Sequence, residues 1–230
     1  MTPTRRDRQR AATLAEIKGA ALSQIADVGA ASLSIRGIAR DIGMSPAGLY
    51  RYYDGLDALI TDLLTDAYND LADAVSLATG VNRQEPADEP EQRLRAGMLA
   101  YRTWAVQHPN RFLLIFGTPI PGYSAPQDGP TVAATRRLAA AYLLPLIDGW
   151  RAGRLAPPAV PREPSPAETA FAEDFPGGYP GTRVAAFLDA WGHFHGLVTL
   201  EILQQLHWIY PDPAGFYAEQ IDRILASWRT

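Results

Sequence analysis

The chain has 230 residues, 47% of them hydrophobic and 20% charged, which is ordinary globular composition with enough apolar material for a core. It contains no cysteine, which excludes disulfide bonds, thiolate metal sites and cysteine nucleophiles. The net charge of −4 divides unevenly, because residues 1–53 carry eight basic and four acidic residues whereas residues 54–230 carry a net −8. Phosphate affinity depends on local basic density, so this asymmetry favours an N-terminal nucleic-acid module, the alternative being a chance gradient.

Membrane and secretory signals are missing from the sequence. No run approaches the roughly 18 uncharged apolar residues of a membrane span, and residues 1–10 lack the apolar stretch of a secretory signal. We therefore expect a cytoplasmic protein without a membrane partner.

The first predicted helix covers residues 7–28, and residues 34–53 then contain two short helices around a tight turn. Ser34 is expected to cap the first short helix, and Gly43 to end it in a left-handed conformation. Ser45 and Pro46 are expected to begin the second as the N-cap and first helical residue. This arrangement describes a helix-turn-helix, which can present its second helix to the major groove of DNA.

Helical patterns continue to the C-terminus, with no internal repeat and no alternating strand pattern. A fourth helix is predicted after Asp54, its cap, with an acidic stripe that we interpret as a solvated face and not a metal site: Asp62, Asp66, Asp70 and Asp73. Further helices are predicted over residues 91–107, 110–116, 131–153, 182–208 and 213–228.

The predicted fold is therefore all-α, with a DNA-binding domain over residues 1–53 and a larger domain over residues 54–230. The larger domain begins with a connecting helix over residues 54–78. Residues 156–181 contain seven prolines and are predicted to form a long, flexible surface loop.

Residues 8–60 resemble the N-terminal domain of TetR-family transcriptional repressors. The resemblance rests on Gly43, Ser45, Leu49, Tyr50 and the aromatic residues that follow, at the spacing of the family. Residues 108–112 and the set Trp191, His195 and Gly196 are similar, more weakly, to a branch whose ligand domain carries a Trp-His-Gly signature. This resemblance implies a homodimeric regulator of double-stranded DNA with a small-molecule effector, no enzymatic activity and no cofactor.

The helix-turn-helix supplies the candidate DNA contacts. Leu49 is expected to face inward and Tyr53 to pack against the fourth helix, which leaves for DNA Ser34, Arg36, Ser45, Pro46, Ala47, Gly48, Tyr50, Arg51 and Tyr52. Arg5, Arg6, Arg8 and Arg10 are expected to form a flexible arm along the DNA, or alternatively a solubilising tail. Leu56 stands where family members commonly place a lysine, so the arm would carry more of the phosphate attraction.

The larger domain is rich in aromatic residues, and the resemblance implies a ligand cavity between its helices. The candidate ligand-binding residues are Tyr101, Trp104, His108, Phe112, Phe116, Trp150, Phe187, Trp191 and His195, with Arg102, Arg111 and Glu201 as further polar anchors. The alternative is an aromatic-rich core. His193 and His195 lie about 200° apart around a helix, so they cannot share a metal ion, and no metal site is predicted.

These observations predict a ligand-responsive homodimeric repressor that binds a palindromic operator and is released by a small, largely hydrophobic effector. The last two helices carry more apolar surface than one packing face requires and are expected to form the dimer interface. The alternatives are an activator or ligand-independent regulator of the same fold, or an α-helical ligand-binding protein or enzyme. For an enzyme the sequence offers no catalytic set with suitable spacing.

Overall fold

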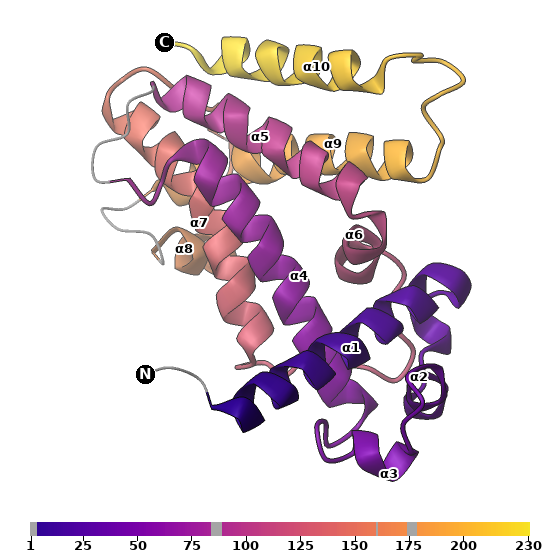
Figure 1. The fold of residues 1–230 in the computed structure, drawn as a ribbon. Coiled ribbons are helices and arrows are strands. Elements are labelled where there is room, and N and C mark those ends of the chain that lie inside the picture. The colour runs from indigo at the N-terminus through magenta and orange to yellow at the C-terminus, as the bar shows by residue number, and fades with distance from the viewer. Residues whose placement is uncertain (1–3, 84–88, 160, 174–178) are drawn as a thin grey trace. The chain divides into compact units, whose positions relative to one another are not determined.

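The computed structural model describes residues 4–83, 89–159, 161–173 and 179–230. Across these residues the regular elements are helices, together with one isolated bridge between Leu155 and Arg229, so the predicted all-α fold is confirmed. Within the same residues no helix has the length and apolar character needed to span a membrane. The chain forms two compact units, Met1–Asn69 with His108–Ala134, and Asp70–Gln107 with Thr135–Thr230 (Figure 1).

The first unit contains the helix-turn-helix. Its elements are α1 (Arg5–Val28), the short 3-10 helix η1 (Ala30–Ser32), α2 (Ile35–Asp41), α3 (Pro46–Leu49), the beginning of α4 (Leu56–Thr79) and α6 (Pro109–Phe116). Fully buried residues from α1, α2, α3 and α4 meet in its core, among them Ile17, Ile38, Leu49 and Leu59. Leu114 of α6 joins the same core, which explains why a segment after residue 107 belongs to this unit.

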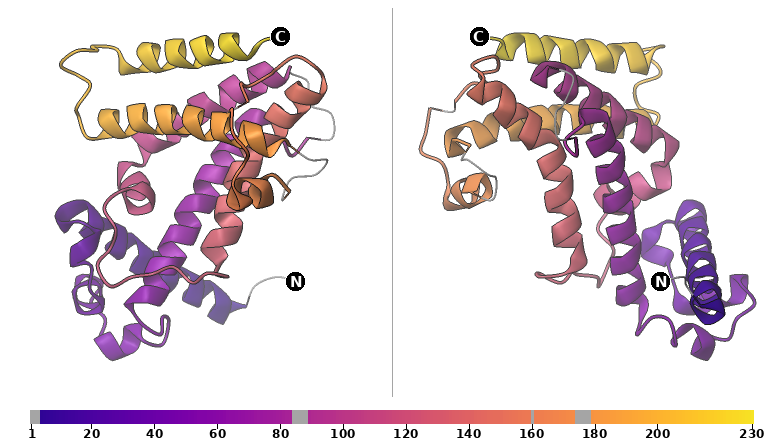
Figure 2. Two further views of the ribbon diagram at one scale, coloured as in Figure 1. Left: turned by 180° about the vertical axis from the view of Figure 1, so that it is seen from behind. Right: turned by 60° about the vertical axis from the view of Figure 1, so that its left-hand side comes forward.

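The second unit is a helical assembly built around α5 (Pro90–Gln107). Its other elements are the end of α4, α7 (Pro130–Arg151) from Thr135 onward, α8 (Pro166–Glu173), α9 (Gly181–Ile202) and α10 (Pro213–Trp228). Helices α9 and α10 lie side by side, joined at one end by residues 203–212, and both contact α5 (Figure 2).

The compact units divide the chain at a different place from the predicted boundary between residues 53 and 54. Helix α4 is continuous, but its residues up to Asn69 pack in the first unit and those from Asp70 in the second. The return of α6 to the first core then removes residues 108–134 from the larger domain.

Two predicted helix starts shift because of local caps. Helix α1 begins at Arg5 because the Thr4 hydroxyl accepts from the Asp7 amide at 3.2 Å while the Asp7 carboxylate accepts from the Thr4 amide. Helix α4 begins at Leu56, so the prediction that Asp54 caps it is wrong. The Leu59 amide instead donates to the carbonyl of Gly55, the residue directly before the helix.

The loop predicted over residues 156–181 contains a helix, α8. Ser165 and Glu168 form a reciprocal cap, with the Ser165 amide donating to the Glu168 carboxylate at 2.7 Å and the Glu168 amide donating to the Ser165 hydroxyl. Pro166 follows the cap at the first helical position. Residues 160 and 174–178 of the predicted loop lie outside the described residues.

Helix α9 ends at Ile202, six residues before the predicted end. Gln204 adopts a left-handed φ of 59°, its amide donates to Glu201, and the Gln205 amide donates to Leu200 at 2.7 Å. These two bonds satisfy the last carbonyls in the pattern of a Schellman motif. Glycine is the usual residue at this left-handed position, so a glutamine there gave no stop signal in the sequence.

The acidic stripe of α4 is solvated in part, as expected, because the side chains of Asp66 and Asp73 are more than half exposed. Each carboxylate of the stripe also has a partner. In the first unit, the Lys18 ammonium lies 2.9 Å from Asp62 and 2.6 Å from Asp66. In the second, the Trp104 indole N–H donates to Asp70 at 3.2 Å, and Arg137 pairs with Asp73. The stripe therefore fastens α4 to the helices around it.

Candidate functional site

Side-chain caps fix the turn between α2 and α3. The Ser34 hydroxyl accepts from the Gly37 amide at 3.1 Å, and the Ser45 hydroxyl accepts from the Gly48 amide at the same distance. Gly43 between the helices has a φ of 64°, a left-handed angle that a glycine adopts without strain. Both serines are exposed, although their hydroxyl oxygens already accept hydrogen bonds from backbone amides.

Helix α3 divides its residues between solvent and core. Ser45, Pro46, Ala47, Tyr50 and Arg51 are exposed, as is Arg36 on α2. The predicted inward orientation of Leu49 is confirmed, since this residue is fully buried. Gly48 is buried as well, and a Cβ there would stand 2.9 Å from Met44 Cγ, so its expected place on the DNA side is wrong. Gly48 allows the turn to pack closely.

The aromatic residues after α3 have separate roles. Tyr53 is buried and its hydroxyl donates to Asp62 of α4 at 2.6 Å, which confirms the predicted packing against that helix. Burial and this carboxylate both raise the Tyr53 pKa. Tyr52 is half-buried, and the Arg10 guanidinium lies 5.2 Å from its ring centre, within the range of a cation–π contact.

The N-terminal arginines are helical, which corrects the expectation of a flexible arm. Arg5, Arg6, Arg8 and Arg10 lie in the first two turns of α1 and are exposed. A cleft separates this helix start from the end of α3, lined by Arg5, Arg6, Gln9, Arg10, Arg51 and Tyr52. Arg8 is outside this lining. The structure therefore brings four guanidinium groups, three from α1 and one from the turn after α3, to one cleft of the first unit.

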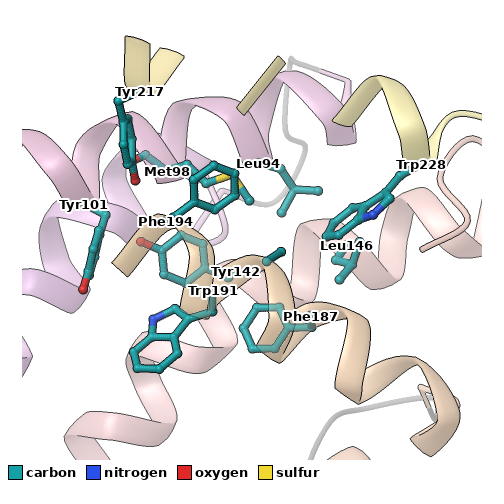
Figure 3. A pocket seen from close by; sticks show the side chains of 11 residues that line it. Leu94, Met98, Tyr101, Tyr142, Leu146, Phe187, Trp191, Phe194, Tyr217 and Trp228 are labelled. Carbon is teal, nitrogen blue, oxygen red and sulfur yellow. The ribbon is translucent and has the colours of Figure 1, made fainter. Parts of the chain in front are cut away.

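The second unit contains a pocket enclosed by α5, α7, α9 and α10 (Figure 3). Its lining is aromatic and aliphatic: Leu94, Met98, Tyr101, Tyr142, Leu146, Phe187, Ala190, Trp191, Phe194, Tyr217 and Trp228. Three of these side chains come from α5 at spacings of four and three residues, which place them on one face of the helix. The cavity volume of the pocket is only about 20 Å³. The pocket is therefore narrow.

Hydrogen bonds orient the three tyrosines of the lining. The Tyr142 hydroxyl donates to the Gly97 carbonyl at 3.4 Å, and the Tyr217 hydroxyl donates to the Met98 carbonyl at 3.1 Å. The Tyr101 hydroxyl lies 2.8 Å from His195 Nδ1 instead. Tyr101 is thus the tyrosine of this lining whose hydroxyl meets an ionisable side chain.

His195 lies behind the lining. Its ring stacks on Trp191, with the ring centres 4.8 Å apart and the planes 15° apart, and Nε2 lies 3.5 Å from the Thr199 hydroxyl. Burial lowers the pKa of His195 below its usual value, because removal from water disfavours the imidazolium. The residue is therefore a neutral imidazole at pH 7.

Carboxylates of other helices pair with the arginines of α5. Arg102 bonds to the buried Glu201 of α9, with Nε 2.7 Å from Oε2, and Arg95 Nε lies 2.6 Å from Asp222 of α10. Arg93, whose side chain is only 7% exposed, donates to Asp148 of α7 and to the Thr79 carbonyl at the end of α4, each at 2.9 Å. The apolar face of α5 lines the pocket while its charges hold the neighbouring helices.

Comparison with known proteins identifies the family. Residues 17–63 match bacterial regulatory proteins of the tetR family, and residues 94–224 match the tetracyclin repressor-like C-terminal domain. The chain is 38% identical over 187 residues to the HTH-type transcriptional regulator Rv1816 of Mycobacterium tuberculosis, a match covering 79% of this chain and 77% of that protein. The chain belongs to the TetR family. It is a transcriptional regulator with a ligand-binding C-terminal domain, from a family of regulators and not of enzymes.

Two solved structures share the TetR fold of the chain. One is the putative regulatory protein SCO4313, with a TM-score of 0.73 and 33% identity, covering 98% of this chain and 100% of that one. The other is a protein of unknown function from Rhodococcus sp. RHA1, with a TM-score of 0.68 and 21% identity over 94% of this chain and 95% of that one. The TetR family binds DNA and small molecules and is typically dimeric.

The expected ligand-binding residues of this TetR-family chain fall into three groups. Tyr101, Phe187 and Trp191 line the pocket, and His195 bonds or stacks with two of them. Trp104 bonds to Asp70, and Trp150 packs edge-on against Tyr179, both outside the lining. The others belong to the first unit and do not line this pocket: His108, Phe112 and Phe116.

The sequence interpretation missed much of the lining. The omitted residues are Leu94, Met98, Tyr142, Leu146, Ala190, Phe194, Tyr217 and Trp228. The apolar spacing from Leu94 to Tyr101 could have indicated an inward face of α5. The contributions of α7 and α10 depend on tertiary packing, which no local pattern reports.

Proposed function

We propose that this TetR-family chain is a repressor that binds a palindromic operator as a homodimer and is released by a small hydrophobic effector. The cleft between α1 and α3 is the observation that carries the proposal, because four arginines converge there beside the exposed face of the recognition helix. Such groups bind phosphate oxygens and fix the register of a protein on DNA. A protein that acts on chromosomal DNA is also expected in the cytoplasm.

Tyr52 gives the cleft a defined geometry. Its ring holds Arg10, so the beginning of α1 and the end of α3 approach the DNA as one surface. Arg51 lines the cleft and Tyr50 precedes it in the chain, and both are exposed for phosphate contacts, with Ala47 available to a thymine methyl group. The exposed serines and Arg36 extend the proposed interface along α2.

The salt dependence of operator binding tests this interface. Each phosphate contact contributes about 0.9 to the slope of log affinity against log salt concentration, so Arg51→Ala and Arg6→Ala should each lower the slope by about that amount. Arg83→Ala is the matched control, because Arg83 is exposed in the second unit. An unchanged slope and affinity in Arg51→Ala would contradict the proposed interface.

Helix α5 supports a route from the effector to the operator. Because the pocket is narrow, an effector of ring size must displace side chains of the lining, three of which belong to α5. Helix α5 also holds the end of α4 through Trp104 with Asp70 and Arg93 with the Thr79 carbonyl. Helix α4 continues into the helix-turn-helix unit. An effector that prefers a different position of α5 would thereby lower operator affinity.

Gel retardation with DNA from the upstream region of the gene tests repression and release. We expect the dimer to retard a palindromic fragment and candidate effectors to raise the dissociation constant. Equal affinity with and without an effector that binds the pocket would overturn the release mechanism.

A further inference from the structure

We propose that α3 selects its operator through the methyl groups of thymines, with the methyl group of Ala47 as the side chain in contact. This inference rests on the proposed function, because it assumes that the first unit binds a palindromic operator with α3 in the major groove. It adds the chemical feature of the DNA that the chain selects and the residue that selects it.

The exposed residues of α3 are the first argument. In a helix-turn-helix, the first residues of the recognition helix approach the base edges in the major groove, and the preceding helix crosses the DNA backbone. Within residues 45–49, all of which the structure describes, Ser45, Pro46 and Ala47 are exposed and the last two residues are buried. The side chains that α3 offers to the bases are therefore those of a serine, a proline and an alanine.

Hydrogen bonding by these side chains discriminates poorly between bases. The Ser45 hydroxyl oxygen already accepts from the Gly48 amide at 3.1 Å. A hydroxyl can donate or accept, so it finds a partner on every base pair of the major groove and does not distinguish them. The side chains of Pro46 and Ala47 have neither a donor nor an acceptor. Selection by the beginning of α3 must therefore use apolar contacts.

The cations of the helix-turn-helix lie where phosphates are expected. The four arginines of the cleft come from the start of α1 and from the turn after α3, and Arg36 lies on α2. Tyr50 follows the last residue of α3 as its C-cap. Contacts of these groups with phosphates fix the register of the protein but carry no sequence information directly. The choice between base sequences therefore depends on the apolar residues of α3.

Thymine supplies the matching apolar group. Among the four bases, thymine alone presents a methyl group in the major groove, and alanine is a side chain that packs against it. The Ala47 side chain has no rotatable bond between heavy atoms, so holding it against the base costs no side-chain entropy. Burying one methyl group in such a contact raises the affinity about 4-fold.

Close packing holds the Ala47 methyl group in place. A Cβ at Gly48 would stand 2.9 Å from Met44 Cγ, so α3 lies tightly against the turn. Leu49 is fully buried in the core of the first unit, at whose margin α3 lies (Figure 1). The backbone that carries Ala47 is therefore fixed before DNA binds, as a contact between two methyl groups requires.

Uracil substitution tests the inference with the full-length protein. Duplexes that the protein enriches from a random pool supply the operator, and each thymine is then replaced by uracil in both half-sites. Uracil lacks the methyl group of thymine and keeps its hydrogen-bonding groups. We expect one such pair of replacements to lower the affinity about 15-fold, because each half-site loses one contact of about 4-fold. Unchanged affinity at every thymine would overturn the inference.

A 5-methylcytosine probe separates the methyl group from the other features of thymine. At the sensitive position, a cytosine–guanine pair should bind weakly in both half-sites. Replacing this cytosine by 5-methylcytosine should raise the affinity about 15-fold, because its methyl group occupies the same place in the major groove. No gain from 5-methylcytosine would show selection by hydrogen bonds or DNA shape, and the inference would fail.

Ala47→Gly tests the assigned residue. The ratio of the affinities for the thymine and uracil operators should fall from about 15 to about 1 in this variant. Ala26→Gly is the matched control, because Ala26 is exposed on α1 and its replacement carries a similar loss of helix propensity. Both affinities in a ratio come from one variant, so a smaller folded fraction cancels. A ratio that stays near 15 in Ala47→Gly would overturn the assignment to Ala47.

The same measurements separate this inference from the proposed function. If no duplex is enriched, the proposed function fails and the inference fails with it. If a palindromic duplex is enriched without a methyl effect, the proposed DNA interface stands and the inference fails. If the methyl effect appears but candidate effectors that bind the protein do not release the DNA, the inference stands and the release mechanism fails.

Discussion

At the scale of single residues, His195 should make stability depend on pH. Its pKa in the folded protein is lowered by burial, whereas the unfolded imidazole takes up a proton near pH 6.5. Between these two pKa values the unfolded state binds more protons, so the free energy of unfolding falls as the pH drops below about 6.5. The stabilising effect of the neutral imidazole is complete above pH 6.5 and is lost as the pH falls through the folded pKa.

His195→Phe removes the titrating group while keeping a ring against Trp191. The difference in the free energy of unfolding between pH 7.5 and pH 5, measured by urea denaturation, should be smaller in this variant than in the wild type. His193→Phe is the control, because His193 is exposed on the same helix and its loss should leave the difference unchanged. An identical pH dependence in His195→Phe and the wild type would contradict the prediction.

Residue-level signals in the sequence identified the local features of the helix-turn-helix, although the cap expected at Asp54 was wrong. The caps Ser34 and Ser45 and the turn glycine Gly43 could be predicted because each acts within three or four residues of itself. The burial of Gly48 could not, since it depends on how the side chain of Met44 folds over the turn.

At the scale of helices, Gly97 permits the close approach of α5 to α4. A Cβ at this position would stand 2.5 Å from Thr79 Cγ2 and 3.4 Å from the Tyr142 ring. Thr79 is fully buried and its hydroxyl donates to the Val75 carbonyl at 3.0 Å, which holds its rotamer. Overpacking at Gly97→Ala should cost about 1–3 kcal/mol, which exceeds the gain in helix propensity of roughly 1 kcal/mol.

Thermal unfolding measures this balance. We expect Gly97→Ala to lower Tm by about 2–4 °C, which corresponds to roughly 1 kcal/mol in a protein of this size. Gly19→Ala is the matched substitution in α1, where a Cβ would meet no atom within 4 Å. It should raise Tm slightly through helix propensity alone. A Tm for Gly97→Ala at or above the wild-type value would show that α4 and α5 can separate without cost.

Helix existence was easier to predict than helix limits or partners. Long apolar periodicities predicted α1, α4, α5, α7, α9 and α10, because apolar residues recur at helical spacing on the buried face of each helix. The sequence did not predict the end of α9, because Gln204 adopts a left-handed conformation that is usually found for glycine. It did not predict α8, because the prolines around Ser165 indicate a loop rather than a helix cap. The partners of the carboxylates in the acidic stripe could not be predicted, because a sequence does not show which helices pack together.

At the scale of the whole molecule, the clustered arginines and the exposed apolar residues lie on different parts of the chain. Four arginines of the first unit gather between the start of α1 and the end of α3, whereas five large apolar residues remain exposed on α9 and the segment after it: Leu188, Leu200, Leu203, Trp208 and Ile209. The neighbouring Leu206, Ile221, Leu225 and Trp228 are buried within the chain. The predicted excess of apolar surface on the last two helices is thus partly core and partly exposed.

The proposed dimer makes a prediction that only the whole assembly can satisfy. Leu200→Glu places a carboxylate on the exposed face of α9, where it would be desolvated against the partner, and should shift the protein from dimer to monomer. Because a palindrome is read by two recognition helices at once, operator affinity should fall by more than about 10-fold although no DNA-facing residue has changed. Sedimentation velocity measures the first effect and gel retardation the second.

Leu77→Glu provides the matched control, since Leu77 on α4 is 78% exposed and should tolerate the charge in both assays. A Leu200→Glu protein that remains dimeric and retains its operator affinity would place the interface elsewhere on the chain.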